Sequence, residues 1–173
     1  PRAVHDRNAY KNASGGGTQM TDGGGVNNGK PLTSRDVAAH EMSHGVTENT
    51  AGLVYTGDAG GLNEATSDIF GTAVEWYASS AADPGDYLIG EKIDINGNGT
   101  PLRYQDKPSR DGNSPDNRYS AIGGLDVHYS SGPANHTFYL LSAGRGAKAI
   151  PHRGSPRPTP DHPTPPGPRR PRP

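Results

Sequence analysis

Two histidines, His40 and His44, stand four positions apart with Glu41 between them, in the stretch HEMSH. On an α-helix this spacing places both imidazoles on one face, about one turn apart, so that both can bind one zinc ion. Glu41 lies about 100° further round the helix, beside the metal, where a general base for an attacking water is needed. The stretch therefore predicts a zinc site with hydrolytic chemistry.

An acidic segment, NEATSD, follows, with Glu64 twenty positions after His44. Glu64 can supply a third zinc ligand, which leaves the fourth position open to water as in catalytic zinc sites. Asp68, one helical turn further on, can accept the remaining ring N–H of His40 or of His44 and so fix that ring. The alternative interpretation is that these groups form only the polar faces of two ordinary helices.

Three helices are expected to carry these groups. Thr33, followed three positions later by Asp36, resembles a capping box, and the apolar stripe after it predicts a helix from about 34 to 50. Apolar residues at helical spacing predict a second helix from about 62 to 79 and a third from about 134 to 144.

Composition divides the chain into three parts. Only 29% of the 173 residues are hydrophobic, and 25 glycines and 17 prolines mark much of the chain as loop. Residues 1–33 are glycine-rich and predict hairpins and loops, whereas residues 34–146 carry the helices and turn-rich connections. Residues 147–173 are dense in proline and arginine, which predicts a disordered tail.

Charge and cysteine content argue against several classes of protein. The formal net charge of -1 gives no electrostatic reason to expect a nucleic acid or an anionic membrane as partner. Without cysteine the chain has neither disulfides nor a thiolate metal site, and no apolar run reaches the length of about eighteen residues expected of a membrane span. Because the chain starts at Pro1 and shows no signal peptide, we interpret it as a processed product or a fragment.

HEMSH and GGLNEATSDIFG, with nineteen residues between the second histidine and the glutamate, resemble the motifs of the thermolysin-like zinc metallopeptidases of the Streptomyces neutral-protease kind. The likeness extends over roughly residues 1–146 and includes segments at 12–20, 101–103 and 123–141. It implies an α+β, zincin-like fold in which a truncated β-rich N-terminal part precedes the active-site helices. It also implies that most of the helical C-terminal half is missing.

The resemblance implies a catalytic role for several residues. The implied zinc ligands are His40, His44 and Glu64. Glu41 would take a proton from the attacking water and pass it to the leaving amine, while His128 and Tyr55 would donate hydrogen bonds to the oxyanion. On the residues alone, His128 is equally a loop histidine and Tyr55 a packing residue.

Further positions match residues of the family that orient the site or contact the substrate. The implied orienting residues are Asn63, Asp68 and Asp126, of which Asp126 could replace an aspartate whose place Gly123 occupies. The implied substrate contacts are Asn12, Ala13, Arg103, Leu102, Val37, Ile89 and Ile93. The first two would pair with the peptide backbone as an added strand, the arginine would hold a carbonyl, and the apolar residues imply cleavage before bulky apolar residues.

The resemblance also implies a calcium site formed by four carboxylates, Asp36, Glu75, Asp86 and Glu91. Hard oxygen ligands from several segments suit Ca²⁺, and without a cation such a cluster repels itself. Leu88 stands where thermolysin has a further acidic ligand, so that one ion is expected rather than two. The alternative is a solvated acidic face.

Two functions follow from these observations. The first is a secreted, extracellular and monomeric zinc endopeptidase that acts on peptide or protein substrates, with Zn²⁺ and Ca²⁺ as cofactors. The second is a truncated, non-catalytic metal-binding remnant, or an interaction segment that acts through the proline-rich stretches SPRPTP and PTPPGP. The intact HExxH pattern favours the first function, and the expected loss of the helical half favours the second.

Overall fold

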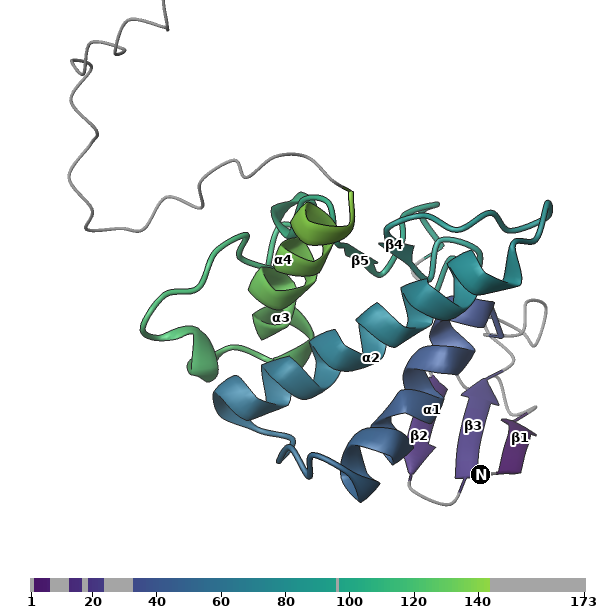
Figure 1. Ribbon diagram of the computed structural model, residues 1–173, viewed down its shortest axis with the longest axis horizontal. Helices are drawn as coiled ribbons and strands as arrows, with labels where there is room; N and C mark the ends of the chain where they lie inside the picture. The colour runs from purple at the N-terminus through teal and green to yellow at the C-terminus, as the bar shows by residue number, and fades with distance from the viewer. Residues whose placement is uncertain (1, 7–12, 17–18, 24–32, 96, 144–173) are drawn as a thin grey trace, which may run out of the picture.

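The computed structural model describes residues 2–6, 13–16, 19–23, 33–95 and 97–143. Within them, a small sheet, two long crossing helices and a smaller helical group follow one another along the chain (Figure 1). This arrangement is α+β, as expected. The tail predicted over residues 147–173 lies outside the described residues.

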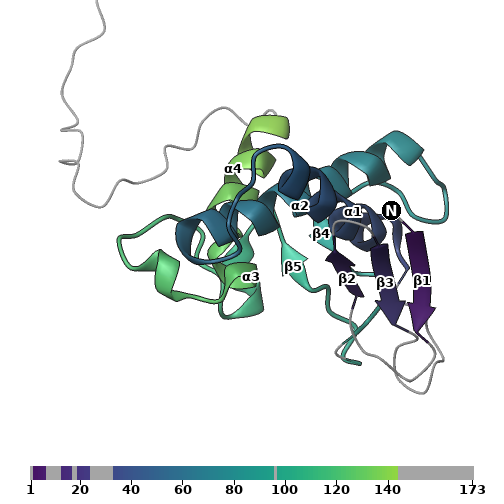
Figure 2. The same cartoon turned by 90° about the horizontal axis from the view of Figure 1, so that it is seen from below.

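The N-terminal sheet has three strands, β1 (Arg2–Asp6), β2 (Ala13–Gly16) and β3 (Gln19–Gly23). Their order is β1-β3-β2, with β1 parallel and β2 antiparallel to the central β3. The first long helix, α1 (Arg35–Asn49), contacts β2 and β3 on one side and the second long helix on the other. Figure 2 shows the sheet beside α1, so that the sheet supports the helix that carries HEMSH.

Helix α1 matches the expected range, but the expected capping box is absent. The N-cap is Ser34, and its side chain makes no capping hydrogen bond. The Asp36 carboxylate accepts a hydrogen bond from the backbone N–H of Gly90 instead of helping to cap the helix. The prediction was wrong because Asp36 is fully buried against another segment, a contact that local sequence does not show.

The second long helix, α2 (Gly57–Ala78), begins five residues before the expected start. Its first turns contain Gly61, where a Cβ atom would lie 2.6 Å from the Ser130 Oγ and 3.0 Å from the Ser130 backbone. Gly71 similarly approaches α1, because a Cβ atom there would lie 2.5 Å from the Asp36 carbonyl oxygen. Close packing on both sides thus requires glycine in α2 and offsets the low helix propensity of that residue.

The rest of the chain contacts α2 along its length, and its helices lie away from the N-terminal sheet (Figure 1). Strands β4 (Leu88–Ile89) and β5 (Arg103–Tyr104) pair antiparallel. Two short 3₁₀ helices follow, η2 (Pro108–Asp111) and η3 (Ile122–Gly124), and then α3 (Val127–Ser130) and α4 (Gly132–Ser142). Helix α4 confirms the third expected helix, with a start two residues earlier.

The interior between α1 and α2 is unusually polar. Its buried side chains include Asp36, His40, Glu64, Asp68 and Glu75. Buried polar groups destabilise a fold unless hydrogen bonds or bound ions satisfy them. The crossing of α1 and α2 is therefore the part of the fold where a functional site is expected.

Among the described residues, no helix is long and apolar enough to span a bilayer.

Candidate metal centre and active site

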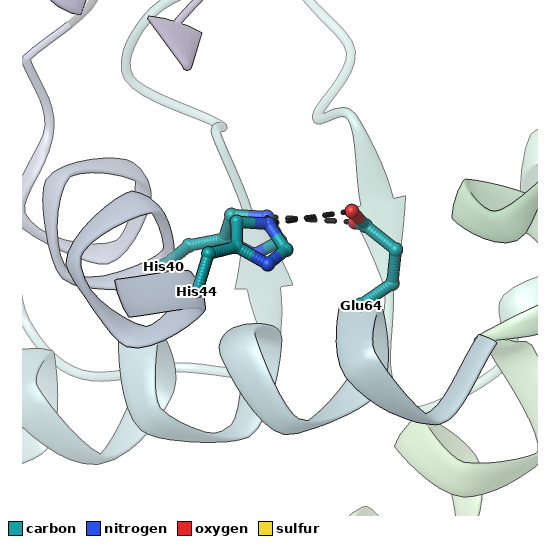
Figure 3. Close-up of side chains that lie close together, drawn as sticks. All are labelled: His40, His44 and Glu64. Atoms are coloured by element: carbon teal, nitrogen blue, oxygen red, sulfur yellow. Dashed lines mark hydrogen bonds and ion pairs between the residues drawn. The ribbon is translucent and has the colours of Figure 1, made fainter. Parts of the chain in front are cut away.

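The three expected zinc ligands meet at the crossing of α1 and α2, where both imidazoles face one carboxylate (Figure 3). The His40 Nε2 lies 3.4 Å from one carboxylate oxygen of Glu64, and the His44 Nε2 lies 3.4 Å from the other. The two Nε2 atoms are 3.1 Å apart. Donor atoms around a tetrahedral zinc ion, at ligand distances of about 2.0–2.1 Å, are separated by roughly 3.3 Å. The three side chains fit such an ion.

Glu64 has the charge state that a zinc ligand needs. Its side chain is fully buried, and its Oε2 atom has no hydrogen-bond partner within the described part of the chain. Burial raises the pKa of Glu64, but the hydrogen bond with His44 and the electrostatic interactions with His40 and Arg103 outweigh it and lower this pKa to about 2. The carboxylate is therefore ionised at neutral pH and keeps an unsatisfied oxygen for a cation.

Each histidine is fixed through its other ring nitrogen. The His40 Nδ1 bonds to the Asp68 Oδ1 at 2.8 Å, and the His44 Nδ1 bonds to the Asn63 Oδ1 at 2.8 Å. Both acceptors require a proton on Nδ1, which leaves the lone pair on Nε2 for a metal. Asp68, for which the sequence allowed either histidine, thus orients His40, while Asn63 orients His44.

Asp68 is also bonded to residues from two other elements. Arg103 on β5 donates from Nε to Oδ2 and from Nη2 to Oδ1, both at 2.7 Å, and Asn135 on α4 donates to Oδ2 at 2.7 Å. Burial raises the pKa of Asp68, but the charge of Arg103 and the bond with His40 hold this pKa far below its ordinary value. Asp68 is therefore a permanent buried anion that balances the positive charge of Arg103 beside the expected zinc ligands.

The two expected oxyanion donors lie beside Glu64. The Tyr55 hydroxyl donates to a carboxylate oxygen of Glu64 and lies 3.3 Å from the His128 Nε2. The His128 Nε2 is 3.6 Å from the same carboxylate. Burial and the adjacent Glu64 raise the pKa of Tyr55, so that its hydroxyl keeps its proton and can donate.

Asp126 is hydrogen-bonded to His128, the residue that the family resemblance implies it would orient. Its Oδ1 accepts from the backbone N–H of His128 at 2.9 Å and is 2.7 Å from the His128 Nδ1. Hydrogen bonds with the backbone and side chain of His128 lower the pKa of Asp126. Gly123 has no side chain that could serve instead, and a Cβ atom at that position would lie 2.6 Å from the Asp58 Oδ1.

The site opens into a cleft of ≈ 680 Å³ that follows α1 from Val37 to Glu48, a distance of about 16 Å for eleven helical residues. Glu41 and Arg103 line it together with the expected zinc ligands. Near Val37 the lining is apolar and contains the expected substrate contacts Ile89, Ile93 and Leu102. Near the other end stands Glu48, which the sequence analysis missed although it lies one helical turn after His44.

One of the two expected strand contacts, Ala13, lies in the N-terminal sheet. Ala13 begins β2, which pairs with β3 and has no second strand neighbour among the described strands. An edge of this kind can accept an extended peptide as an additional strand. Asn12 lies outside the described residues.

Comparison with known proteins agrees with this geometry. Residues 1–48 match the thermolysin metallopeptidase catalytic domain, and residues 51–155 match the thermolysin metallopeptidase alpha-helical domain. The chain belongs to the thermolysin metallopeptidase family.

Several known proteins are similar in sequence to most of this chain. The transglutaminase-activating metalloprotease of Streptomyces mobaraensis is 65% identical over 147 residues, which cover 85% of this chain and 19% of that protein. The neutral protease of Vibrio proteolyticus is 48% identical over 80% of this chain and 22% of its own length. The precursor of protealysin from Serratia proteamaculans has a similar structure, with a TM-score of 0.60 and 32% identity over 78% of this chain and 47% of its own. The chain thus spans about a fifth of these two sequence relatives.

A second group of acidic side chains lies where the first turn of α1 meets the last turns of α2. Oxygen atoms of Asp36, Glu75 and Glu91 lie within 4.8 Å of one another. One oxygen of Asp36, one of Glu75 and both of Glu91 are buried without a hydrogen-bond partner in the described part of the chain. Unsatisfied buried carboxylate oxygens are suitable ligands for a hard cation such as Ca²⁺.

The electrostatics of this acidic group also favour a cation. Burial, followed by repulsion from Glu91 and Asp36, raises the pKa of Glu75 to about 8. Burial and repulsion from Asp36 and Asp86 likewise raise the pKa of Glu91 to about 7. Asp86 is not part of this close group, and its Oδ1 accepts from the Leu88 N–H at 2.7 Å. Asp83, which the sequence analysis missed, adds charge on the same side.

Proposed function

We propose that this chain carries the active site of a secreted zinc metalloendopeptidase that cleaves peptide bonds before bulky apolar residues. The observation that carries the proposal is the triangle of His40 Nε2, His44 Nε2 and Glu64 carboxylate, with donor distances of 3.1 to 3.4 Å. This triangle opens into a cleft that also holds Glu41, Tyr55 and His128. Membership of the thermolysin metallopeptidase family supports the same reaction.

Zinc bound in this triangle would lower the pKa of a water molecule and polarise the peptide carbonyl. Glu41 would accept the proton of the attacking water and deliver it to the leaving amine. Tyr55 and His128 would donate hydrogen bonds to the developing oxyanion, which they reach from beside Glu64. Asp126 is bonded to the His128 Nδ1 and so would hold the ring with Nε2 beside Glu64, where it faces the developing oxyanion.

The substrate would lie along α1, with its backbone beside the free edge of β2. The residue after the scissile bond would enter the apolar end of the cleft, formed by Val37, Ile93 and Leu102. Arg103 also lines the cleft, with its Nη2 3.9 Å from the Glu64 Oε2, and would there hold a carbonyl of the substrate. This arrangement supports the proposed preference for bulky apolar residues.

We also propose one structural Ca²⁺ ion held by Asp36, Glu75 and Glu91, with Asp86 and Asp83 contributing charge nearby. The family resemblance also implies a monomer that acts outside the cell on peptide substrates. The two proposed metal sites are consistent with such a protein. The partners are then protein or peptide substrates.

The first test is zinc content together with hydrolysis. We expect one zinc per chain. We also expect kcat/KM for a fluorogenic peptide with leucine after the scissile bond to be about 10²-fold higher than for the same peptide with aspartate at that position. Folded protein without zinc would contradict the proposal. Zinc without hydrolysis would favour the second function considered from the sequence, a metal-binding remnant.

Replacing Asp126 by serine tests the orientation of His128. Serine still caps α3 but places no carboxylate on the His128 Nδ1. We therefore expect kcat to fall roughly tenfold, which is less than the loss on removal of an oxyanion donor itself, and KM to change little. Steady-state kinetics on the leucine peptide measure both constants. The control is Asp106→Ala, which removes an exposed pair with Arg110. An unchanged kcat in Asp126→Ser would exclude the orienting role.

A further inference from the structure

Asn135 stands apart from the residues that the sequence analysis identified. It lies on α4, is 1% exposed, and donates from Nδ2 to the Asp68 Oδ2 at 2.7 Å. The direction of this hydrogen bond is fixed, because an ionised carboxylate only accepts and the amide NH₂ only donates. Asn135 is thus bonded to the carboxylate that orients a zinc ligand.

The hydrogen bonds of Asp68 are evenly divided between its two oxygens. Oδ1 accepts from the His40 Nδ1 and from the Arg103 Nη2, while Oδ2 accepts from the Arg103 Nε and from Asn135. Four donors fix the plane of the carboxylate and aim Oδ1 at His40. Without Asn135, Arg103 alone would hold Oδ2, and Arg103 also lines the cleft where the substrate binds.

We infer that Asn135 is a positioning residue for the zinc site, which acts on His40 through Asp68. This inference rests on the proposed function, because it requires His40 to be a zinc ligand. Through this bond α4 holds the orienting carboxylate in place independently of Arg103. Arg103 can then adjust to a substrate carbonyl while the His40 ring stays fixed.

A purely structural role for Asn135 predicts a different result. The amide would then serve only to satisfy a buried polar contact between α4 and α2, and its loss would lower stability without a specific effect on zinc. A positioning role predicts that its loss weakens zinc binding, and that this loss depends on Asp68. A double-mutant cycle separates the two roles.

The test measures the zinc dissociation constant of the full chain by competition with a chelating indicator. Loss of an outer partner of a ligand typically weakens metal binding about 10–100-fold, so Asn135→Ala is expected to raise the constant roughly tenfold. In an Asp68→Ala background, the same substitution is expected to change the constant by less than about twofold. Circular dichroism and thermal unfolding report the fold of each variant.

Thr72→Ala provides a matched control. Thr72 is buried one helical turn after Asp68, and it bonds to Gln105 at 3.0 Å rather than to the zinc site. We expect this variant to lose stability and to keep its zinc affinity. Asn135→Asp, which has nearly the same shape but sets a second carboxylate against Asp68, is expected to weaken zinc binding at least as much as Asn135→Ala.

Each result decides the inference. Wild-type protein that binds zinc while both Asn135 variants bind it equally well would overturn the inference and leave the proposed function intact. Equal effects of Asn135→Ala with and without Asp68 would also overturn it. Loss of fold in both Asn135 variants, with Thr72→Ala folded, would show that Asn135 serves packing. Wild-type protein that binds no zinc would overturn the proposed function itself.

Discussion

Replacing Glu64 by glutamine is expected to lower the zinc affinity of the chain on the order of a thousandfold, whereas Glu41→Gln leaves the affinity nearly unchanged. The reason is the different position of the two carboxylates. Glu64 is fully buried and faces both Nε2 atoms at 3.4 Å, so that it supplies the only negative charge of the ligand triangle. The free energy of zinc binding at structural sites is about 10–16 kcal/mol. Divided among three or four ligands, this corresponds to a loss of affinity on the order of a thousandfold for each ligand removed.

Glu41→Gln is expected to abolish hydrolysis in the protein that still binds zinc. Glutamine has almost the same shape as glutamate but cannot accept a proton from water, and a positioned acid or base contributes about 10²–10⁴-fold to a rate. Zinc content and kcat on the leucine peptide, measured on the same samples, give both results. If Glu41→Gln lost zinc as completely as Glu64→Gln, Glu41 would have to be a ligand, and the assignment of the base would fail.

The parts of the site that depend on helical periodicity could be predicted from the sequence. The spacing of His40 and His44 specifies one helix face wherever the helix lies, and the expected helix around them is confirmed as α1. Glu64 required a second helix that crosses the first at the right point. The family motif supplied that point, and Figure 3 shows the three side chains together.

Other parts depend on which segments pack together, which spacing does not determine. Asp68 could orient either histidine until the crossing of α1 and α2 set it beside His40. Asn135 comes from a helix 67 positions later in the chain, and nothing in its local sequence indicates a contact with Asp68. The early start of α2 likewise depends on the fit of Gly61 against Ser130. These features follow from tertiary contacts that override local propensity.

The acidic group around Glu75 is expected to make the stability of the metal-free protein decrease with rising pH. The folded-state pKa values of about 8 for Glu75 and about 7 for Glu91 lie above the ordinary value of 4.5. The folded state therefore holds more protons than the unfolded state between these limits, so the stability present below pH 4.5 is lost as pH rises towards 8. His44 adds to the decrease of stability with rising pH. Burial lowers the pKa of His44, but the hydrogen bond with Glu64 and its charge outweigh burial, so that this pKa lies above its ordinary value.

Calcium is expected to remove most of this decrease. At a calcium concentration about 100 times Kd, binding to the folded state alone stabilises it by ~2.7 kcal/mol, which corresponds to a rise in Tm of roughly 5–10 °C. The rise is expected to be large at pH 8, where the carboxylates are ionised, and small at pH 5, where protons compete with the ion. Thermal unfolding in calcium and in a calcium chelator, across this pH range, measures the difference.

Glu75→Gln isolates the contribution of the acidic group from that of His44. Glutamine keeps the shape of the side chain but neither titrates nor attracts the ion, so the calcium response should disappear and the chelated protein should show a shallower pH slope. Asp106→Asn, which neutralises an exposed carboxylate paired with Arg110, should leave both unchanged. A calcium response that persists in Glu75→Gln would place the ion elsewhere. A pH slope identical in calcium and in chelator would show that Asp36, Glu75 and Glu91 bind no cation and carry their charges without one.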